Sequence, residues 1–178
     1  METKTILALA LKSMTEAGTF EGKLATYGNI DEVGDVCDYG CMTKTLKEGG
    51  AQLPLCWQHD TSQPIGTLTL TDTPQALLCK GKLVLSVPAA RSAYDLVREG
   101  VVKGLSIGYT VMKHTMEDSG VRRLKELRLF EGSLVTLAAN PLAQITAVKQ
   151  LPDTEALEAF RNAARDIKDF HRRVIDGN

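Results

Sequence analysis

The chain has 178 residues and a formal net charge of −1, with 43% hydrophobic and 24% charged residues. These values are ordinary for one soluble globular domain, and a chain of this length can bury a real core. The lack of a basic excess argues against a nucleic-acid partner, and the lack of a single-sign field argues against a membrane surface.

The longest apolar runs, such as residues 83–90, fall far short of the roughly 20 residues that a membrane helix needs. Residues 1–4 lack the basic start and long apolar stretch of a signal peptide. We therefore expect a protein that is kept in a cytoplasm. In that compartment the four cysteines are expected to be thiols rather than a disulfide framework.

The first half of the chain predicts mainly short strands. The apolar run over residues 4–11 predicts a buried strand, and the alternation over 20–28 predicts a second. A turn-rich stretch, 28–35, follows, and 43–48 predicts a short helix that ends at Gly49 and Gly50. Further strands are predicted over 54–59, 65–70 and 76–87.

The second half adds two helices. Residues 88–100 predict a helix that begins near a proline and stops at a glycine. Two strands, 105–112 and 121–130, flank a polar hairpin at 117–120, and 133–137 continue the sheet. Apolar residues at helical spacing over 153–175 predict an amphipathic helix.

These elements predict a mainly β fold with helices (α+β), in which a closed or nearly closed β-barrel is wrapped by helices. We expect a main domain over residues 1–150 and a C-terminal helix or tail over 151–178.

Residues 104–108 read Gly-Leu-Ser-Ile-Gly, which matches the G-x-S-x-G pattern of the α/β-hydrolase nucleophile elbow. The context does not fit that fold, because the predicted helix precedes Ser106 and strand-like residues follow it. The histidines downstream, His114 and His171, lie in a polar hairpin and a charged tail. The glycines nevertheless allow other backbone to approach Ser106 closely.

Three further positions are candidates for chemistry. His59 lies at the end of an apolar strand beside a loop, where an imidazole can take a proton from a hydroxyl, although a lone histidine is more often structural. Glu131 follows an alternating strand and can orient such an imidazole, although a surface carboxylate is the more common case. The turn at Ala139 and Asn140 can aim backbone N–H groups at an oxyanion, or it is an ordinary loop.

A zinc site is an alternative use of the cysteines. Cys37 and Cys41 could join Cys56 and His59 in a tetrahedral set. No paired C-x2-C motif is present, however, and Cys56 and Cys79 lie in apolar, strand-like runs, where cysteine behaves as a small hydrophobe. We therefore expect no metal.

Several segments in a fixed order carry a family resemblance. They are Phe20-x-Gly22, Tyr27-Gly28-Asn29-x-Asp31-x-x-Gly34-Asp35, Trp57-Gln58-His59-Asp60, Pro64-Ile65-Gly66, Ala93-Tyr94-Asp95-Leu96-Val97-Arg98-Glu99-Gly100, Lys103-Gly104-Leu105-Ser106-Ile107-Gly108-Tyr109, Glu131-x-Ser133-Leu134-Val135-Thr136 and Ala139-Asn140-Pro141-x-Ala143. Together they resemble the tailed-phage prohead maturation protease family, over most of the chain. Gly132 is a departure, since it stands where that family usually has an aliphatic residue.

The resemblance implies a fold similar to the herpesvirus assemblins and a serine endopeptidase activity. It assigns the nucleophile to Ser106, its base to His59 and the third member to Glu131. It also implies an oxyanion-binding and substrate-binding turn around Ala139 and Asn140, and no cofactor.

The resemblance further implies the partners. The expected substrates are the scaffold protein or a scaffold-like extension of the major capsid protein, inside the prohead in the bacterial host cytoplasm, with self-processing. A dimer is expected by analogy with the assemblins. Two alternatives stay open: a non-enzymatic module that binds capsid or scaffold, and an unrelated esterase that uses Ser106.

Overall fold

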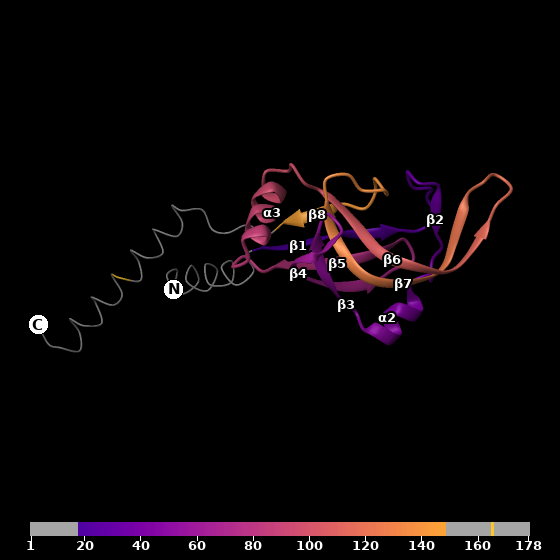
Figure 1. Ribbon diagram of the computed structural model, residues 1–178, viewed down its shortest axis with the longest axis horizontal. Helices are drawn as coiled ribbons and strands as arrows, with labels where there is room; N and C mark the ends of the chain where they lie inside the picture. The colour runs from indigo at the N-terminus through magenta and orange to yellow at the C-terminus, as the bar shows by residue number, and fades with distance from the viewer. Residues whose placement is uncertain (1–17, 149–164, 166–178) are drawn as a thin grey trace, which may run out of the picture. The chain divides into compact units, whose positions relative to one another are not determined.

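The computed structural model describes residues 18–148 and Arg165, and the predicted strand at 4–11 and helix at 153–175 lie outside the described residues. Residues 18–148 form one compact unit, made mostly of β-strands (Figure 1). Within this part of the chain, no helix combines the length and the apolar character needed to cross a membrane.

Strands of three to fourteen residues build one eight-stranded sheet. In chain order they are β1 (Thr19–Thr26), β2 (Asp35–Cys37), β3 (Gln52–Trp57), β4 (Asp60–Asp72), β5 (Ala76–Leu83), β6 (Gly104–Met116), β7 (Arg122–Val135) and β8 (Ile145–Val148). Their order across the sheet is β2-β7-β3-β4-β5-β1-β8, and β6 pairs with β7 outside this path.

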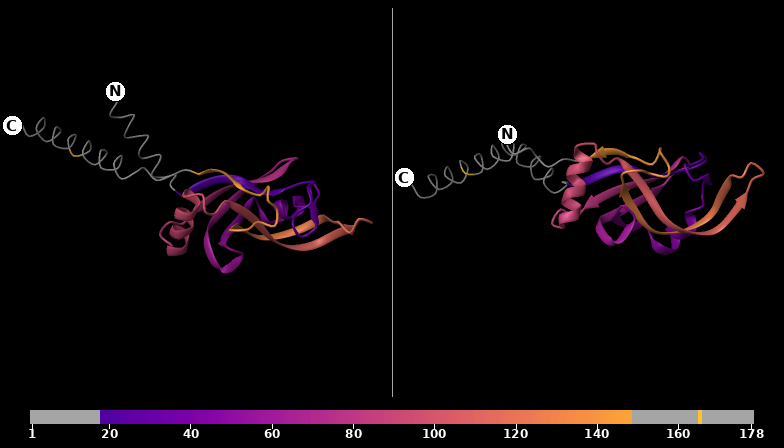
Figure 2. Two further views of the ribbon diagram at one scale, coloured as in Figure 1. Left: turned by 90° about the horizontal axis from the view of Figure 1, so that it is seen from above. Right: turned by 45° about the horizontal axis from the view of Figure 1, so that its top comes forward.

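The sheet curls into an open half-barrel (Figure 2). Between β6 and β8 the described residues hold only an isolated bridge, Gly104–Gln144, and single backbone bonds such as that from the Leu105 N–H to the Ala143 carbonyl, 2.9 Å. The prediction of a mainly β fold with few helices is thus confirmed. The described residues form no closed ring of strand ladders, because β8 pairs with β1 and the bonds toward β6 come from residues 143–145 at its start.

Two helices lie against the sheet. Helix α3 (Pro88–Arg98) begins with the predicted proline and packs at one end of the sheet, against β4 and β5 (Figure 1). It is amphipathic, since Ala90, Ala93, Tyr94 and Val97 are buried while its other face meets solvent. Helix α2 (Thr43–Gly49) is one short segment against β7.

Two strand boundaries differ from the prediction in ways that matter for function. The strand predicted over 54–59 ends at Trp57, because the next two residues form a tight turn. The two strands predicted over 121–130 and 133–137 are one strand, β7, that runs through Gly132. A Cβ at Gly132 would collide with Leu68 and lie 3.1 Å from Leu24, so these two leucines leave no space for a side chain at this position.

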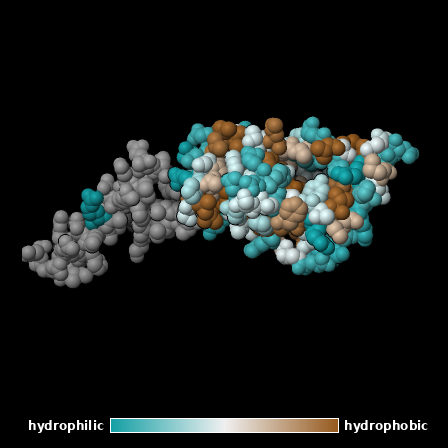
Figure 3. Space-filling view, in the orientation of Figure 1, coloured by the Kyte–Doolittle hydropathy of each residue, from teal (hydrophilic) through white to brown (hydrophobic). Residues whose placement is uncertain are grey.

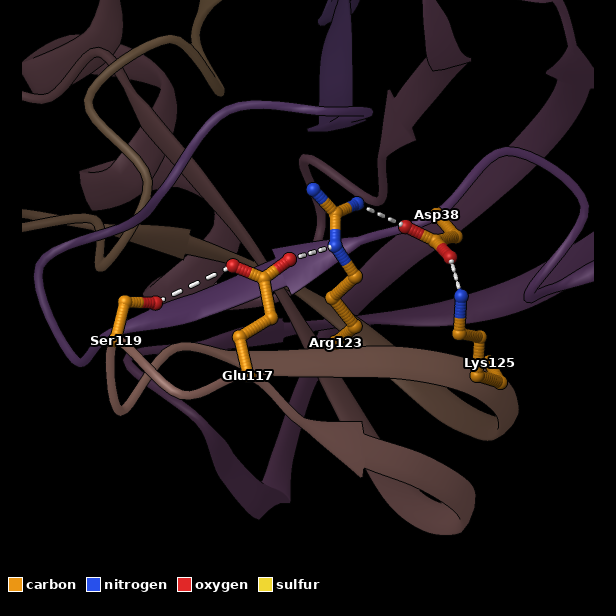
Figure 4. A network of polar contacts seen from close by, with 5 residues as sticks. All are labelled: Asp38, Glu117, Ser119, Arg123 and Lys125. Atoms are coloured by element: carbon orange, nitrogen blue, oxygen red, sulfur yellow. Dashed lines mark hydrogen bonds and ion pairs between the residues drawn. The ribbon is translucent and has the colours of Figure 1, made fainter.

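Charged side chains stabilise the turn end of the long β6–β7 hairpin (Figure 4). Asp38, just after β2, accepts from Arg123 at 2.7 Å and also pairs with Lys125. Arg123 in turn pairs with Glu117 at the start of the hairpin turn. The hydrogen bonds to Lys125 and then Arg123 lower the pKa of Asp38, against the effect of its partial burial.

The surface mixes hydrophobic and hydrophilic residues, as the face in Figure 3 shows. Among the large exposed apolar side chains are Ile30 and Val33 on one loop and Leu137 and Leu142 on another. These two loops are joined by the backbone bond from the Glu32 N–H to the Ala139 carbonyl, 2.8 Å.

Truncation of a core leucine tests the sheet packing. Leu68 is fully buried beneath Gly132, so Leu68→Ala should lower the free energy of unfolding by about 2–5 kcal/mol. Leu137→Ala is the matched control, because Leu137 is 89% exposed and should change stability by less than about 0.5 kcal/mol. Urea unfolding followed by the fluorescence of Trp57, the one tryptophan, measures both; equal losses would contradict the packing described.

The ion pairs of Asp38 with Lys125 and Arg123 should make the stability of the fold depend on pH. Because its pKa is lowered in the folded state, ionised Asp38 contributes stability that is fully present above its unfolded pKa of about 3.9. That contribution is lost as the pH falls through the lower folded pKa. Asp38→Asn should therefore be less stable than wild type near neutral pH and should approach it in acid. A stability difference that stays constant down to about pH 2 would contradict this.

Candidate active site

The turn between β3 and β4 carries His59. Trp57 pairs with Asp60 across a two-residue turn, and both central residues, Gln58 and His59, have positive φ, 53° and 63°. Type I′ hairpin turns require this conformation and normally use asparagine and glycine for it. Gln58 and His59 are thus held in a region that costs on the order of 1–3 kcal/mol for such residues.

Ser106 lies on β6, and no strand-to-helix elbow surrounds it. In the pairing of β6 with β7, Gly104 faces Val135, Ser106 faces Ser133 and Gly108 faces Glu131. Residues two apart on a strand share a face, so the three positions Gly104, Ser106 and Gly108 present one side of β6. Leu105 points the other way and is fully buried in the core.

Ser106, His59 and Glu131 form one hydrogen-bonded line. His59 Nε2 lies 2.9 Å from Ser106 Oγ, and His59 Nδ1 lies 2.7 Å from Glu131 Oε1. An ionised carboxylate only accepts, so a neutral His59 beside ionised Glu131 carries its proton on Nδ1 and leaves Nε2 free to accept from the serine. Glu131 is buried, whereas the His59 side chain is 45% exposed. The structure therefore brings together all three predicted members of the triad.

Two neighbours that the sequence analysis did not single out hold the His59 turn. Ser133 Oγ accepts the His59 backbone N–H at 3.1 Å and donates to Glu131 Oε2 at 2.7 Å. Gln58 donates its backbone N–H to the Leu134 carbonyl, 3.0 Å, and its amide pairs twice with Thr136. The signals for them in the sequence are their places in the family segments that contain His59 and Glu131, one and two residues from those side chains.

Ala139 and Asn140 lie in the loop that follows β7. The described residues show no hydrogen bond from either of them to the triad. The Asn140 amide instead donates to Thr26 Oγ1 at 2.7 Å and its oxygen accepts from Asn29 at 3.1 Å. The loop at Asn29, which is another segment of the family pattern, thus holds the loop at Asn140 in place. The Asn140 side chain is a structural brace here, and the oxyanion role of the turn stays a prediction.

A cavity of about 800 Å³ opens beside this loop. Its wall includes Ala139, Leu137 and Pro141, together with Gly104, which is two residues from Ser106 on the same face of β6. Thr136, held by Gln58, also lines it. The cavity therefore adjoins the start of β6, the strand that carries Ser106.

The four cysteines are free thiols. Cys56 lies on β3, where it pairs in register with Ser133 of β7. Burial, and then the nearby charges of Glu131 and Asp60, raise the pKa of the Cys56 thiol. Cys56 is thus kept in its neutral, weakly nucleophilic form. Within residues 18–148, there is no cluster of three or more histidine, cysteine, aspartate or glutamate side chains that could bind a metal ion.

Residues 7–157 match the model of a protein family described as the caudovirus prohead serine proteases. The chain belongs to this family. The resemblance predicted from the sequence is thus confirmed.

Two phage proteins are among the relatives of this chain. The prohead protease of Enterobacteria phage HK97 is 29% identical over 154 residues, which is 84% of this chain and 68% of that protein. The capsid polyprotein of Pseudomonas phage PAJU2 is 29% identical over 127 residues, 62% of this chain but only 18% of the polyprotein.

Solved structures agree on the fold. The bacteriophage T4 capsid assembly protease matches with a TM-score of 0.51 and 12% identity, over 66% of this chain and 82% of that one. The KSHV protease, solved with a hexapeptide phosphonate inhibitor, matches with a TM-score of 0.51 and 13% identity, over 83% of this chain and 77% of that one. The chain therefore has the assemblin-like fold that the family resemblance implied.

Gly108 offers a test of the triad geometry. A Cβ at this position would come well inside 3.0 Å of Glu131 Oε1 and within 2.6 Å of the Phe130 ring, so the carboxylate must move. We expect Gly108→Ala to reduce peptide cleavage about 10²-fold, the effect of a misplacement near 1 Å. Gly49→Ala, with open space at its Cβ, is the control and should cleave normally. Full activity of Gly108→Ala would mean that Glu131 does not depend on this gap.

Proposed function

We propose that this protein is a serine endopeptidase with Ser106 as nucleophile, His59 as general base and Glu131 as the group that orients His59. The observation that carries the proposal is the unbroken line from Ser106 Oγ through His59 to Glu131, with contacts of 2.9 and 2.7 Å. Geometry of this kind defines a triad wherever it occurs, whatever the fold.

In the proposed reaction, His59 Nε2 takes the Ser106 proton as Oγ attacks a peptide carbonyl. The negative charge on Glu131 stabilises the imidazolium that forms, and its burial strengthens that interaction. His59 then protonates the leaving amine, and water releases the acyl group. The exposed side of His59 leaves room for an extended peptide beside β6.

Backbone N–H groups of the loop at Ala139 and Asn140 are the proposed oxyanion donors. The brace from Asn29 and Thr26 to the Asn140 amide supports this role, because oxyanion stabilisation needs donors that are fixed before reaction. The cavity at Ala139 and Leu137 is the proposed place for a substrate side chain, and its wall offers apolar surface at Val101, Leu137 and Pro141 beside the charged Glu32 and Lys103.

The proposed substrates are the scaffold protein or a scaffold-like extension of the major capsid protein, cut inside the prohead in the host cytoplasm, with self-processing. Family membership supports a capsid-maturation role, and the likeness to a capsid polyprotein supports a close link between such a protease and capsid chains. A dimer is part of the proposal, by analogy with the assemblins. No cofactor takes part in it.

The test is co-expression with the neighbouring capsid and scaffold proteins, with intact masses read by mass spectrometry. Wild type should shorten one of these chains at a defined site, and Ser106→Ala should lower cleavage on the order of 10⁴-fold or more. Ser86→Ala, which removes an exposed hydroxyl, is the control and should cleave like wild type.

Three results would contradict the proposal. Cleavage that survives in Ser106→Ala would remove this serine from the mechanism. Stable binding of capsid or scaffold by wild type without any shortening would favour a non-enzymatic assembly module. Turnover of small esters but not of peptides from these chains would favour an esterase.

A further inference from the structure

Ser133 lies at the point where the three strands that carry the triad meet. In register it faces Ser106 on β6 and Cys56 on β3, and its side chain is fully buried. It belongs to the segment Glu131-x-Ser133-Leu134-Val135-Thr136 of the family pattern, but the sequence analysis gives it no role.

The Ser133 hydroxyl makes two different contacts. As a donor it binds Glu131 Oε2 at 2.7 Å, the carboxylate oxygen that does not face His59. As an acceptor it takes the backbone N–H of His59 at 3.1 Å. One hydroxyl thus fixes the rotation of the triad carboxylate and the position of the residue that this carboxylate orients.

Both contacts answer a physical need. A buried carboxylate needs a donor on each oxygen, since an unsatisfied charged oxygen in a low-dielectric site is costly. The His59 backbone has φ of 63° and cannot relax to an ordinary strand while its N–H is held. Alanine at position 133 would release both at once, without touching the reacting atoms.

We propose that Ser133 is a positioning residue of this protease, which holds Glu131 and His59 in register for the reaction with Ser106. The proposal rests on the triad mechanism proposed above. Its role is carried through Glu131 and His59, so its loss should lower kcat and leave peptide binding almost unchanged.

The first experiment does not need catalysis. In protein with ¹⁵N-labelled histidine, the Nδ1–H proton of His59, assigned by its loss in His59→Ala, should give a low-field NMR signal because it is bonded to Glu131. Ser133→Ala should shift this signal upfield or broaden it beyond detection. Ser86→Ala should leave it in place. An unchanged signal in Ser133→Ala would overturn the proposal, whatever the enzyme does.

The second experiment uses a peptide that spans the cleavage site. Ser133→Ala should lower kcat about 10²-fold with KM within about twofold of wild type. Ser133→Thr, which keeps the hydroxyl, should recover part of kcat. A fall that appears only in KM, or equal losses in the alanine and threonine variants, would point to a structural role alone.

A double-mutant cycle decides whether Ser133 acts through the carboxylate. Added to Glu131→Gln, the Ser133→Ala change should cost less than about threefold in kcat, because the group it positions is already disabled. Full additivity of the two losses would overturn the proposal. In these assays, activity in wild type and its loss in Ser106→Ala show that the proposed function holds, independently of the outcome at Ser133.

Discussion

The position of β7 between β3 and β6 is the constraint on which the site depends. Ser106 and His59 are 47 residues apart and His59 and Glu131 are 72 apart, so only the sheet brings them together. β3 runs parallel to β7 and delivers His59 just beyond its end, while β6 runs antiparallel and sets Ser106 opposite Ser133. A slip of one residue in either ladder would turn one member of the triad to the opposite face of the sheet.

The same strand also holds the conformational strain of the site. Gln58 and His59 have positive φ without the glycine or asparagine that such a turn favours, and β7 provides the bonds that keep them there. The Leu134 carbonyl holds Gln58, and Ser133 holds His59 and Glu131 together. Well-packed strands thus support a strained pair of residues at the one place where the proposed chemistry needs it.

Prediction from the sequence was most accurate where a local pattern has only one physical outcome. The alternation of β1 and β5, the proline start of α3 and the hairpin between β6 and β7 follow from such patterns, as does the mainly β class. It was weaker where tertiary contacts decide. The end of β3 at Trp57 depends on hydrogen bonds from β7, and the continuity of β7 depends on Leu24 and Leu68 filling the gap at Gly132. The four residues of β8 are too few to show a pattern.

For the site, the residue types at His59, Ser106 and Glu131 each allowed an ordinary structural role, and only the family resemblance selected them. The roles of Ser133 and Gln58 were not assigned, although both lie in family segments, because they depend on contacts with His59, Leu134 and Thr136 across the sheet.

The G-x-S-x-G pattern shows how one set of letters can serve two geometries. In a nucleophile elbow the glycines relieve crowding where a strand turns into a helix. Here the chain stays a strand, and the glycines matter because a period of two puts them on the same face as Ser106. Gly108 leaves room for the Glu131 carboxylate, and Gly104 leaves room for the Val135 carbonyl, which would lie 2.7 Å from a Cβ there. The two glycines thus leave space on both sides of Ser106. Gly108 leaves space for Glu131, and Gly104 leaves space for the end of β7, from which the loop beside the cavity continues. A pattern of residues therefore points to chemistry only together with the element that carries it.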